Sequence, residues 1–163
     1  MRRMRLRLFT GVVSVVIVAC SSGQSSSRPK STVTTTNGLL GHAFQETAVL
    51  AKASPYGAIL AASFDVTVYV NVHDSPRHSN CAGTCTKTWI PLTVRRSPEV
   101  GEGVSASLLG IIRRDDGRKQ VTYNGHPLYT YRGDHQPLEA IGQGASGNWY
   151  VISASGDPVR GTQ

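Results

Sequence analysis

The chain has no hydrophobic run long enough to cross a membrane. Its most apolar stretch, residues 9–19, has 11 residues, about half of the roughly 20 that a spanning helix needs. Four arginines and no acidic residue precede it, and a short apolar run after a positive start is typical of a secretory signal peptide. The sequence therefore predicts export, with residues 1–19 as the signal peptide.

An excess of charge of one sign is also missing once the leader is set aside. The whole chain has a net charge of +7, but four of its 17 Lys and Arg lie in the leader. Residues 20–163 keep 13 basic against 10 acidic residues, a net charge of +3. Domains that bind nucleic acid carry a denser basic patch. We therefore expect no nucleic-acid partner, and only a mild attraction to anionic envelope surfaces.

The sequence lacks the residue patterns of common catalytic sites. No carboxylate pair has a spacing that indicates hydrolysis, and no nucleophile lies beside a general base in a known motif. The glycine-rich stretch 142–149 is followed by neither a helix nor a Lys-Ser/Thr pair, which argues against a phosphate-binding loop. These absences favour a protein that is not an enzyme.

Cysteine is scarce too, and the first of the three cysteines ends the leader. The stretch IVAC (17–20) resembles the lipobox of bacterial lipoproteins. This resemblance implies cleavage before Cys20 and attachment of a diacylglycerol, with acyl chains such as palmitate, to its thiol. Two acyl chains give stable anchoring. We therefore expect an extracytoplasmic protein held on the bacterial cell membrane or outer membrane by its N-terminal lipid.

The other two cysteines, Cys81 and Cys85, have the spacing C-x3-C. Thiols outside the cytoplasm tend to oxidise, and a disulfide here would close a five-residue loop and stabilise the fold by about 2 kcal/mol in the chain-entropy estimate. The spacing differs from the C-x2-C of thioredoxin-like centres. A structural disulfide is the favoured interpretation, and an exchangeable redox pair is one alternative.

A metal site is the other alternative for this segment. Imidazole and thiolate groups together suit copper or zinc. The candidate ligands are His73, His78, Cys81 and Cys85, with Asp74 between them. Their spacing matches no standard ligand pattern, so the sequence predicts no cofactor, with copper or zinc as the alternative.

The amino-acid composition of the chain changes near residue 54. Residues 20–53 are rich in Ser and Thr and too poor in apolar residues to form a core. They predict a flexible tether of about 30 Å mean reach, although residues 42–53 fit either a helical turn or a first strand. Residues 54–163 are the predicted folded domain.

Short runs typical of strands, separated by turn residues, fill this domain. Residues 66–72 alternate Val with Thr, Tyr and Asn, which predicts a half-buried strand with the valines on one face. Residues 110–123 contain two runs around an Asp-Asp-Gly turn signal and predict a hairpin. Further runs lie at 58–62, 127–131 and 149–153. With no amphipathic helix evident, the pattern predicts a mainly β, compact antiparallel domain.

One pattern occurs twice in the domain, and all its members are shifted along the chain by the same amount. Each copy spaces Tyr from Asp by five residues and Asp from Trp by fifteen, and uses one of the chain's two tryptophans. The members are Tyr69, Asp74 and Trp89 in the first copy and Tyr129, Asp134 and Trp149 in the second. We therefore expect two related repeats, over about 54–92 and 110–159.

These copies fit the motif Y-x4-D, also written Y-x-(F/W/Y)-x-x-D. The stretches that carry the wider resemblance are SPYGAIL (54–60), YVNVHD (69–74), CAGTCTKTWIPL (81–92), VTYNGHPLY (121–129), YTYRGD (129–134) and GASGNWYVISASGDPV (144–159). Over about 105 residues the chain resembles the bacterial lipoproteins with a "secreted repeat of unknown function". The resemblance implies export, lipid anchoring and a repeated β fold, without an assigned activity. The chain departs from the pattern at Asn71, where an aromatic is expected, at Phe64-Asp65, where an Asn-Gly-like turn is expected, and at Ile90, which interrupts a Trp-Pro-Pro.

The two motif aspartates follow the Tyr strands at positions where the chain must turn, because residues five apart on a straight strand face opposite ways. We expect Asp74 and Asp134 to accept hydrogen bonds from backbone N–H groups two or three residues further on, while the Tyr and Trp residues fill the core between the repeats. The alternative makes the aspartates ligands or acid–base groups.

The sequence thus favours an exported, membrane-anchored module that binds an envelope protein or another ligand without catalysis. The alternative is an extracytoplasmic redox or copper- or zinc-handling protein that uses residues 73–85. A purely structural envelope component is a third interpretation.

Overall fold

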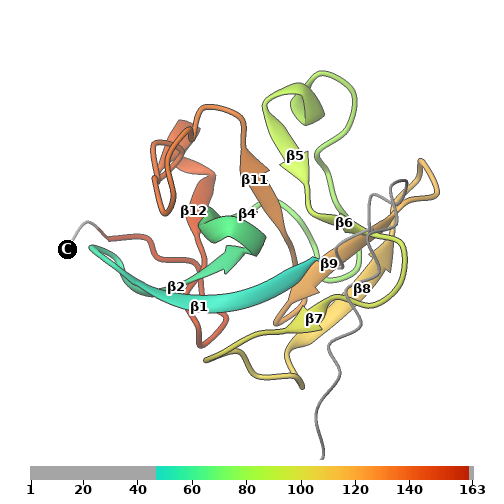
Figure 1. Cartoon of the computed structure of the whole chain (residues 1–163). Helices are drawn as coiled ribbons and strands as arrows, with labels where there is room; N and C mark the ends of the chain where they lie inside the picture. The colour runs from blue at the N-terminus through green and yellow to red at the C-terminus, as the bar shows by residue number, and fades with distance from the viewer. Residues whose placement is uncertain (1–46, 162–163) are drawn as a thin grey trace, which may run out of the picture. The chain divides into compact units, whose positions relative to one another are not determined.

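The structure is a computed structural model that describes residues 47–161 (Figure 1). The predicted signal peptide, the predicted lipidation site Cys20 and the predicted tether up to residue 46 lie outside the described residues. Twelve short strands and three 3-10 turns make up the described part, which confirms the prediction of a mainly β fold. No helix in this part is long and apolar enough to cross a membrane.

Elements occur in the same order in the two halves of the domain. The first half contains β1 (Ala48–Ser54), β2 (Gly57–Ala62), η1 (Ser63–Asp65), β3 (Val66–Thr67), β4 (Tyr69–Asn71), η2 (Cys85–Lys87) and β5 (Trp89–Pro91). The second half contains β8 (Leu109–Arg113), β9 (Lys119–Tyr123), β10 (His126–Pro127), β11 (Tyr129–Tyr131), η3 (Ala145–Gly147) and β12 (Trp149–Val151). Between them lie β6 (Thr93–Val94) and β7 (Glu99–Val100). Each half is therefore one structural repeat.

Each repeat begins with an antiparallel hairpin. The hairpin β1–β2 continues into β3, and β7 adds to β1 in parallel, which gives the order β3-β2-β1-β7. The hairpin β8–β9 continues into β10, and β6 pairs with β9. The predicted hairpin over 110–123 is thereby confirmed. The chain reverses at Gly117, whose φ of 81° suits glycine.

A third sheet, with the order β12-β4-β11-β5, joins the repeats by exchanging their strands (Figure 1). Strand β4 of the first repeat pairs with β12 of the second, and β11 of the second repeat pairs with β5 of the first. The two middle strands meet where Tyr69 pairs with Tyr129. Each pairing maps onto its counterpart by the shift that relates the two sequence copies, so the sheet has an approximate two-fold axis between these tyrosines. Neither repeat completes this sheet alone.

The predicted strand over 66–72 differs from expectation in two ways. It breaks at Val68 into β3 and β4, and it is buried on both faces rather than one. Val68 and Val70 lie in one hydrophobic core with residues of both hairpins, whereas Tyr69 lies in a second core with the tryptophans. Val66, in contrast, is 38% exposed. Alternation failed as a guide because this strand runs between two cores.

Two further boundaries are decided by the fold. Strand β1 starts at Ala48, so the end of the predicted tether is a strand of the first hairpin. The turn at Phe64-Asp65 has φ values of 64° and 58°, and the turn at Asn124-Gly125 has 47° and 79°. Both repeats thus use left-handed backbone before the motif strand, although only the second carries the residues that favour it.

Candidate functional site: the exchanged Tyr–Asp pairs

The two motif tyrosines each bond to the aspartate of the other repeat. The Tyr69 hydroxyl donates to Oδ2 of Asp134 over 2.7 Å. The Tyr129 hydroxyl donates to Oδ2 of Asp74 over 2.5 Å. The Y-x4-D motif therefore forms the contact between the two repeats. Its spacing within one repeat did not indicate this role.

Strand exchange explains this partner choice. Strands β4 and β11 run antiparallel, and their first residues, Tyr69 and Tyr129, pair with each other, so the two motif tyrosines meet where the repeats join. After each strand the chain turns, with the N–H of Asp134 bonded to the carbonyl of Tyr131 and the N–H of Asp74 bonded to the carbonyl of Asn71. Each aspartate then meets the tyrosine of the neighbouring strand, so a spacing of five residues takes the chain past the end of its own strand to the other repeat.

The aspartates also accept backbone hydrogen bonds, but not from the predicted donors. Oδ1 of Asp74 accepts from the N–H of Asn80 over 2.7 Å, and Oδ1 of Asp134 accepts from the N–H of Ile141 over 3.0 Å. These donors lie six and seven residues further on, so the expectation of two or three was wrong. Each carboxylate closes a whole loop that leads towards the next strand, rather than a single tight turn.

Burial governs the titration of these four groups. It raises the pKa of the Asp74 and Asp134 carboxyls, while the hydrogen bonds from the tyrosines act in the opposite direction. It also raises the pKa of the Tyr69 and Tyr129 hydroxyls, and the neighbouring carboxylates add to that effect. The tyrosines are therefore neutral hydrogen-bond donors at physiological pH.

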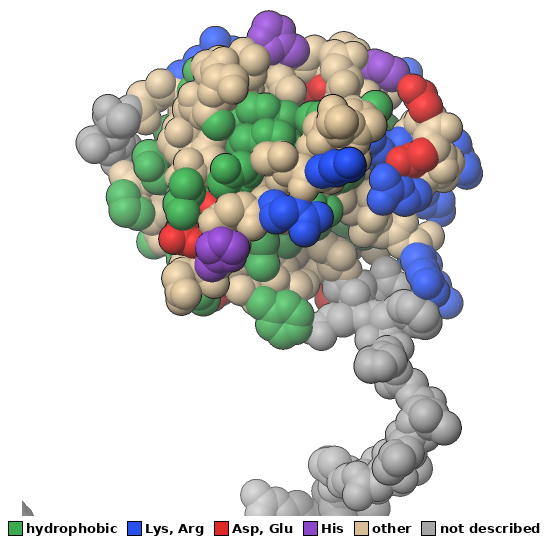
Figure 2. Space-filling model, turned by 90° about the horizontal axis from the view of Figure 1, so that it is seen from above, with side chains coloured by type: hydrophobic (Ala, Val, Ile, Leu, Met, Phe, Trp, Pro, Cys, Tyr) green, Lys and Arg blue, Asp and Glu red, His purple; other side chains and the backbone are tan. Residues whose placement is uncertain are grey.

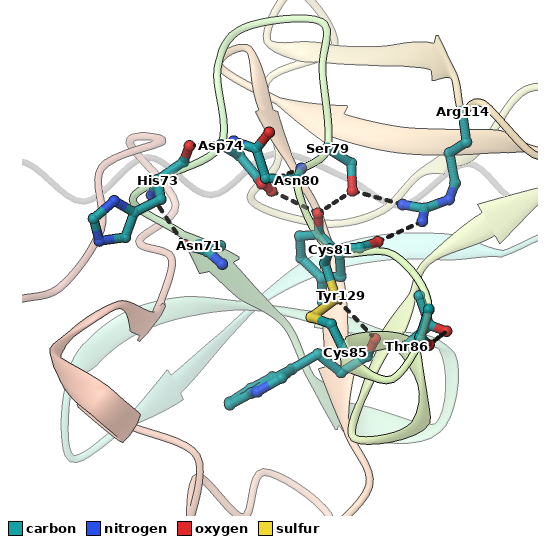
Figure 3. The surroundings of a disulfide bond; sticks show 12 residues. Asn71, His73, Asp74, Ser79, Asn80, Cys81, Cys85, Thr86, Arg114 and Tyr129 are labelled. Carbon is teal, nitrogen blue, oxygen red and sulfur yellow. Dashed lines mark hydrogen bonds between the residues drawn. A yellow bond between two sulfur atoms is a disulfide. The ribbon is translucent and has the colours of Figure 1, made fainter.

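The Asp74 pair belongs to a longer buried network (Figure 3). Ser79 Oγ lies 2.5 Å from the Tyr129 hydroxyl, and the Arg114 guanidinium donates to Ser79 Oγ over 2.6 Å. Arg114 also donates to Gln120 Oε1 and to the carbonyl of Cys81, both over 2.6 Å. The network connects the loop after Asp74 to the turn of the second hairpin.

Arg114 is the site residue that sequence reasoning missed. Its side chain is only 5% exposed, whereas the preceding Arg113 is exposed. Consecutive residues at a strand end point to opposite sides, so one of the two arginines had to face inward. That alternation was the available signal.

The structure confirms the disulfide between Cys81 and Cys85, with Cα atoms 5.3 Å apart. Cys81 is buried, at 1% exposure, and the carbonyl of this residue accepts from Arg114. The disulfide therefore holds one end of the network. Gly83, with φ of 58°, lets the small loop turn back.

The proposed metal ligands do not converge. Both sulfur atoms are in the disulfide, and His73 Nε2 lies 2.8 Å from Asn148 Oδ1 of the other repeat. The backbone of His78 pairs with Ser75. Within residues 47–161, no three His, Cys, Asp or Glu side chains form a group that could hold a metal ion. The copper or zinc alternative stays a prediction without structural support.

Removal of the disulfide tests its structural role. We expect the double variant Cys81→Ala and Cys85→Ala to lose about 2 kcal/mol of unfolding free energy, the chain-entropy value for so short a loop. Urea denaturation of the oxidised, reduced and double-variant proteins gives the comparison, and reduction is expected to have the same effect as the variant. Unchanged stability in both would contradict a structural role and favour the redox alternative.

The motif tryptophans and tyrosines form one aromatic cluster across the approximate two-fold axis. Trp89 and Trp149 stack with ring centroids 4.0 Å apart and planes 5° apart. Tyr69 meets Trp89 edge to face at 5.3 Å, and Tyr129 meets Trp149 in the same way at 5.0 Å. These contacts place the repeated residues in the core between the repeats.

The departure at Asn71 breaks the symmetry of this cluster. Tyr131 of the second repeat packs on Trp89 with centroids 4.5 Å apart. Its equivalent, Asn71, pairs with Trp149 in the sheet but carries no ring. Its Oδ1 instead accepts from the N–H of His73 over 2.9 Å. The first repeat thus replaces an aromatic contact by a polar cap on the loop towards the disulfide.

Comparison with known proteins identifies the second repeat. Residues 110–153 match the family Lipoprotein_15, described as a secreted repeat of unknown function, which confirms the resemblance expected from the sequence. The matched stretch holds β8 to β12, nearly the whole second repeat. Neither the curated proteins nor the solved structures contained a match to the chain.

Proposed function

We propose that this protein is a non-catalytic binding module of the bacterial envelope, because its second repeat matches a family of secreted lipoprotein repeats. Lipidated Cys20 anchors it, residues 21–46 connect the anchor to the domain, and the β domain presents its loops to a protein or a small ligand. The family association with secreted lipoproteins supports an extracytoplasmic, envelope-associated location.

The reciprocal Tyr–Asp pairing is the observation that carries the proposal. The chemically active side chains of the motif bond to each other between repeats, and the tyrosine pKa values are raised. A motif used in this way holds the fold together. Function then belongs to the loops and surface hollows around the motif, which is the arrangement expected of a binding module rather than an enzyme.

The surface charge supports only weak attachment to anionic surfaces. Figure 2 shows Lys and Arg side chains gathered on one side of the visible face, with acidic side chains among them. A cleft of about 330 Å³ lies between the disulfide loop and the β8–β9 turn, and Arg113, Arg114 and Arg118 contribute to its lining. Asp116 binds Arg118 over 2.7 Å and offsets part of this charge. The cleft therefore contributes little to membrane attachment beyond the proposed lipid anchor.

Photo-cross-linking in the native envelope tests the proposed function. The exposed residues Val100, Ile111 and Ile141 are replaced one at a time, for example Ile111→p-benzoylphenylalanine. We expect a discrete adduct from at least one position, in the membrane fraction. Cys20→Ala is expected to release the protein from that fraction and abolish the adduct, whereas the neighbouring Ser21→Ala changes neither.

Two outcomes would contradict the proposal. Membrane retention of the Cys20→Ala variant would refute the anchor. A folded, membrane-bound protein that gives no adduct from any of the three positions would refute a stable partner on these surfaces.

A further inference from the structure

The two repeats diverge around one pocket. Positions related by the shift from Tyr69 to Tyr129 have equivalent places in the fold, so a difference in residue type shows where the repeats have diverged. Six of the seven residues that line a hollow of about 160 Å³ differ from their equivalents, and only Asp134 is the same in both repeats. The pairs, with the pocket residue first, are Phe64 and Asn124, Val66 and His126, Thr67 and Pro127, His135 and Ser75, Gln136 and Pro76, and Pro137 and Arg77. We name it the Phe64 pocket.

The side chain of Phe64 contributes little to the stability of the fold. It is 79% exposed and has φ of 64°. Left-handed backbone is unfavourable for a residue with a bulky side chain, and the equivalent residue is Asn124, which tolerates it. An exposed and strained aromatic side chain at the rim of a pocket is typical of a ligand contact.

Thr67 lines the same pocket and carries a buried hydroxyl without a hydrogen-bond partner in the described part of the chain. The residue is 1% exposed, and its hydroxyl has no hydrogen-bond partner among the described residues. A buried hydroxyl without a partner is unfavourable, and its equivalent, Pro127, has no such group. Thr67 therefore opposes stability where the other repeat does not, as expected if the hydroxyl serves a ligand.

Asp134 supplies the charge of the pocket. Its carboxylate accepts from Tyr69 and from the N–H of Ile141, and a carboxylate has about four lone-pair sites. Two sites remain for a donor in the pocket. Asp74 is placed differently, because the tyrosine that binds it also contacts Ser79, and Ser79 in turn accepts from Arg114.

The lining of the Phe64 pocket favours a cation. Asp134 is its acidic member and His135 its basic member, and none of the described residues that line it is Lys or Arg. Glu139 lies near enough to interact with Asp134 electrostatically. An aromatic ring face attracts cations, and Phe64 offers one at the rim. Val66 and Pro137 supply apolar contacts for a carbon chain.

From these contacts we infer that the Phe64 pocket binds a primary ammonium group on a short aliphatic chain. The ammonium donates to the Asp134 carboxylate and to the Thr67 hydroxyl and lies against the ring of Phe64, with its carbon chain between Val66 and Pro137. A free diamine and the side chain of a diamino acid both present this group. The inference rests on the proposed binding function and specifies one ligand class for it.

Isothermal titration calorimetry of the purified protein at low ionic strength tests the inference. The probes are 1,5-diaminopentane and Nα-acetyl-lysine methylamide, and the neutral probe is methyl glucoside. We expect a dissociation constant of about 1 mM for an ammonium probe and no binding of the neutral probe. Tighter binding of the diamine indicates a free amine as the natural ligand, and tighter binding of the lysine derivative indicates a diamino acid.

Two variants separate binding from folding. Phe64→Asn and Thr67→Val are each expected to weaken ammonium binding by roughly tenfold, the loss of one good contact. Both are expected to keep or raise the melting temperature, because the first relieves backbone strain and the second removes the unpaired hydroxyl. Ile111→Thr, which changes an exposed apolar residue on β8, is the matched control and should bind normally.

Several outcomes would overturn the inference. These are no saturable binding of either ammonium probe up to about 50 mM, well above the expected constant, equal binding by wild type and both pocket variants, and preferential binding of methyl glucoside. None of them bears on photo-cross-linking at Val100 and Ile111, because neither residue lines the Phe64 pocket.

Discussion

Arg114→Leu is expected to lower the free energy of unfolding by about 3–5 kcal/mol, the usual effect of removing one partner from a buried charged network. The guanidinium donates to Ser79 Oγ, Gln120 Oε1 and the carbonyl of Cys81. Leucine fills part of the space but leaves Gln120 Oε1 and the Cys81 carbonyl without the donor they have in the wild type, and each unpaired group is unfavourable by about 1–3 kcal/mol. Ser79 Oγ keeps its contact with the Tyr129 hydroxyl.

Arg113→Leu is the matched control, because Arg113 precedes Arg114 in the chain and is exposed. Its effect on stability should stay within about 0.5 kcal/mol. Urea denaturation followed by tryptophan fluorescence measures both variants. Equal and small losses in the two would show that the buried arginine does not hold the disulfide loop to the second hairpin.

The second large effect is expected at the stacked tryptophans. Trp89→Ala should destabilise the protein by about 3–5 kcal/mol, as deletions of buried tryptophan side chains do. Trp89 is 7% exposed and contacts Trp149, Tyr69 and Tyr131. These three ring contacts lie at the sheet that the two repeats share. Removal of the Trp89 side chain therefore weakens the contact between repeats and also leaves a cavity.

A double-mutant cycle isolates the stack between repeats. Trp89→Ala, Trp149→Ala and the double variant should give a coupling energy of about 1 kcal/mol, the range for aromatic pairs. Ile90→Ala on the same strand is the control, since Ile90 is 38% exposed, and its effect should be much smaller. A coupling energy near zero would mean that the two tryptophans stabilise their own repeats independently.

Both predictions follow from one property of the fold, the exchange of strands between repeats. A single repeat leaves its motif tyrosine without an aspartate and its tryptophan without a stacking partner. The reciprocal geometry, with Tyr69 bound to Asp134 and Tyr129 to Asp74, needs both copies. This accounts for the presence of two complete motifs in one chain, even though the loops around them differ.

Much of the fold was predictable because its signals are local. Turn residues at 115–117 and at Asn124-Gly125 mark reversals of the chain in any context, and the strand-like runs of the second repeat coincide with β8, β9, β11 and β12. The disulfide was predictable because its cysteines are only four residues apart. The failure at 66–72 has a physical cause as well. Period-two alternation indicates one buried face, and this segment packs against a core on each side.

The candidate site was predictable in membership but not in arrangement. The spacing of Tyr69, Asp74 and Trp89, which recurs once further along the chain, identified the side chains that form the contact between repeats. It did not indicate which tyrosine meets which aspartate, because that depends on the antiparallel pairing of β4 with β11. Burial of Arg114 and the lining of the Phe64 pocket likewise depend on segments that lie far apart in the chain.

The amino-acid sequence by itself determined the class of fold, the number of repeats, the cysteine pair and the residues at the contact between repeats. Each of these depends on neighbouring residues or on one fixed spacing along the chain. Only the tertiary structure decided the exchange of strands, the partner of each aspartate and the difference between the Asp74 and Asp134 surroundings. Those depend on pairing energies summed over distant segments, and no local pattern of residues contains that sum.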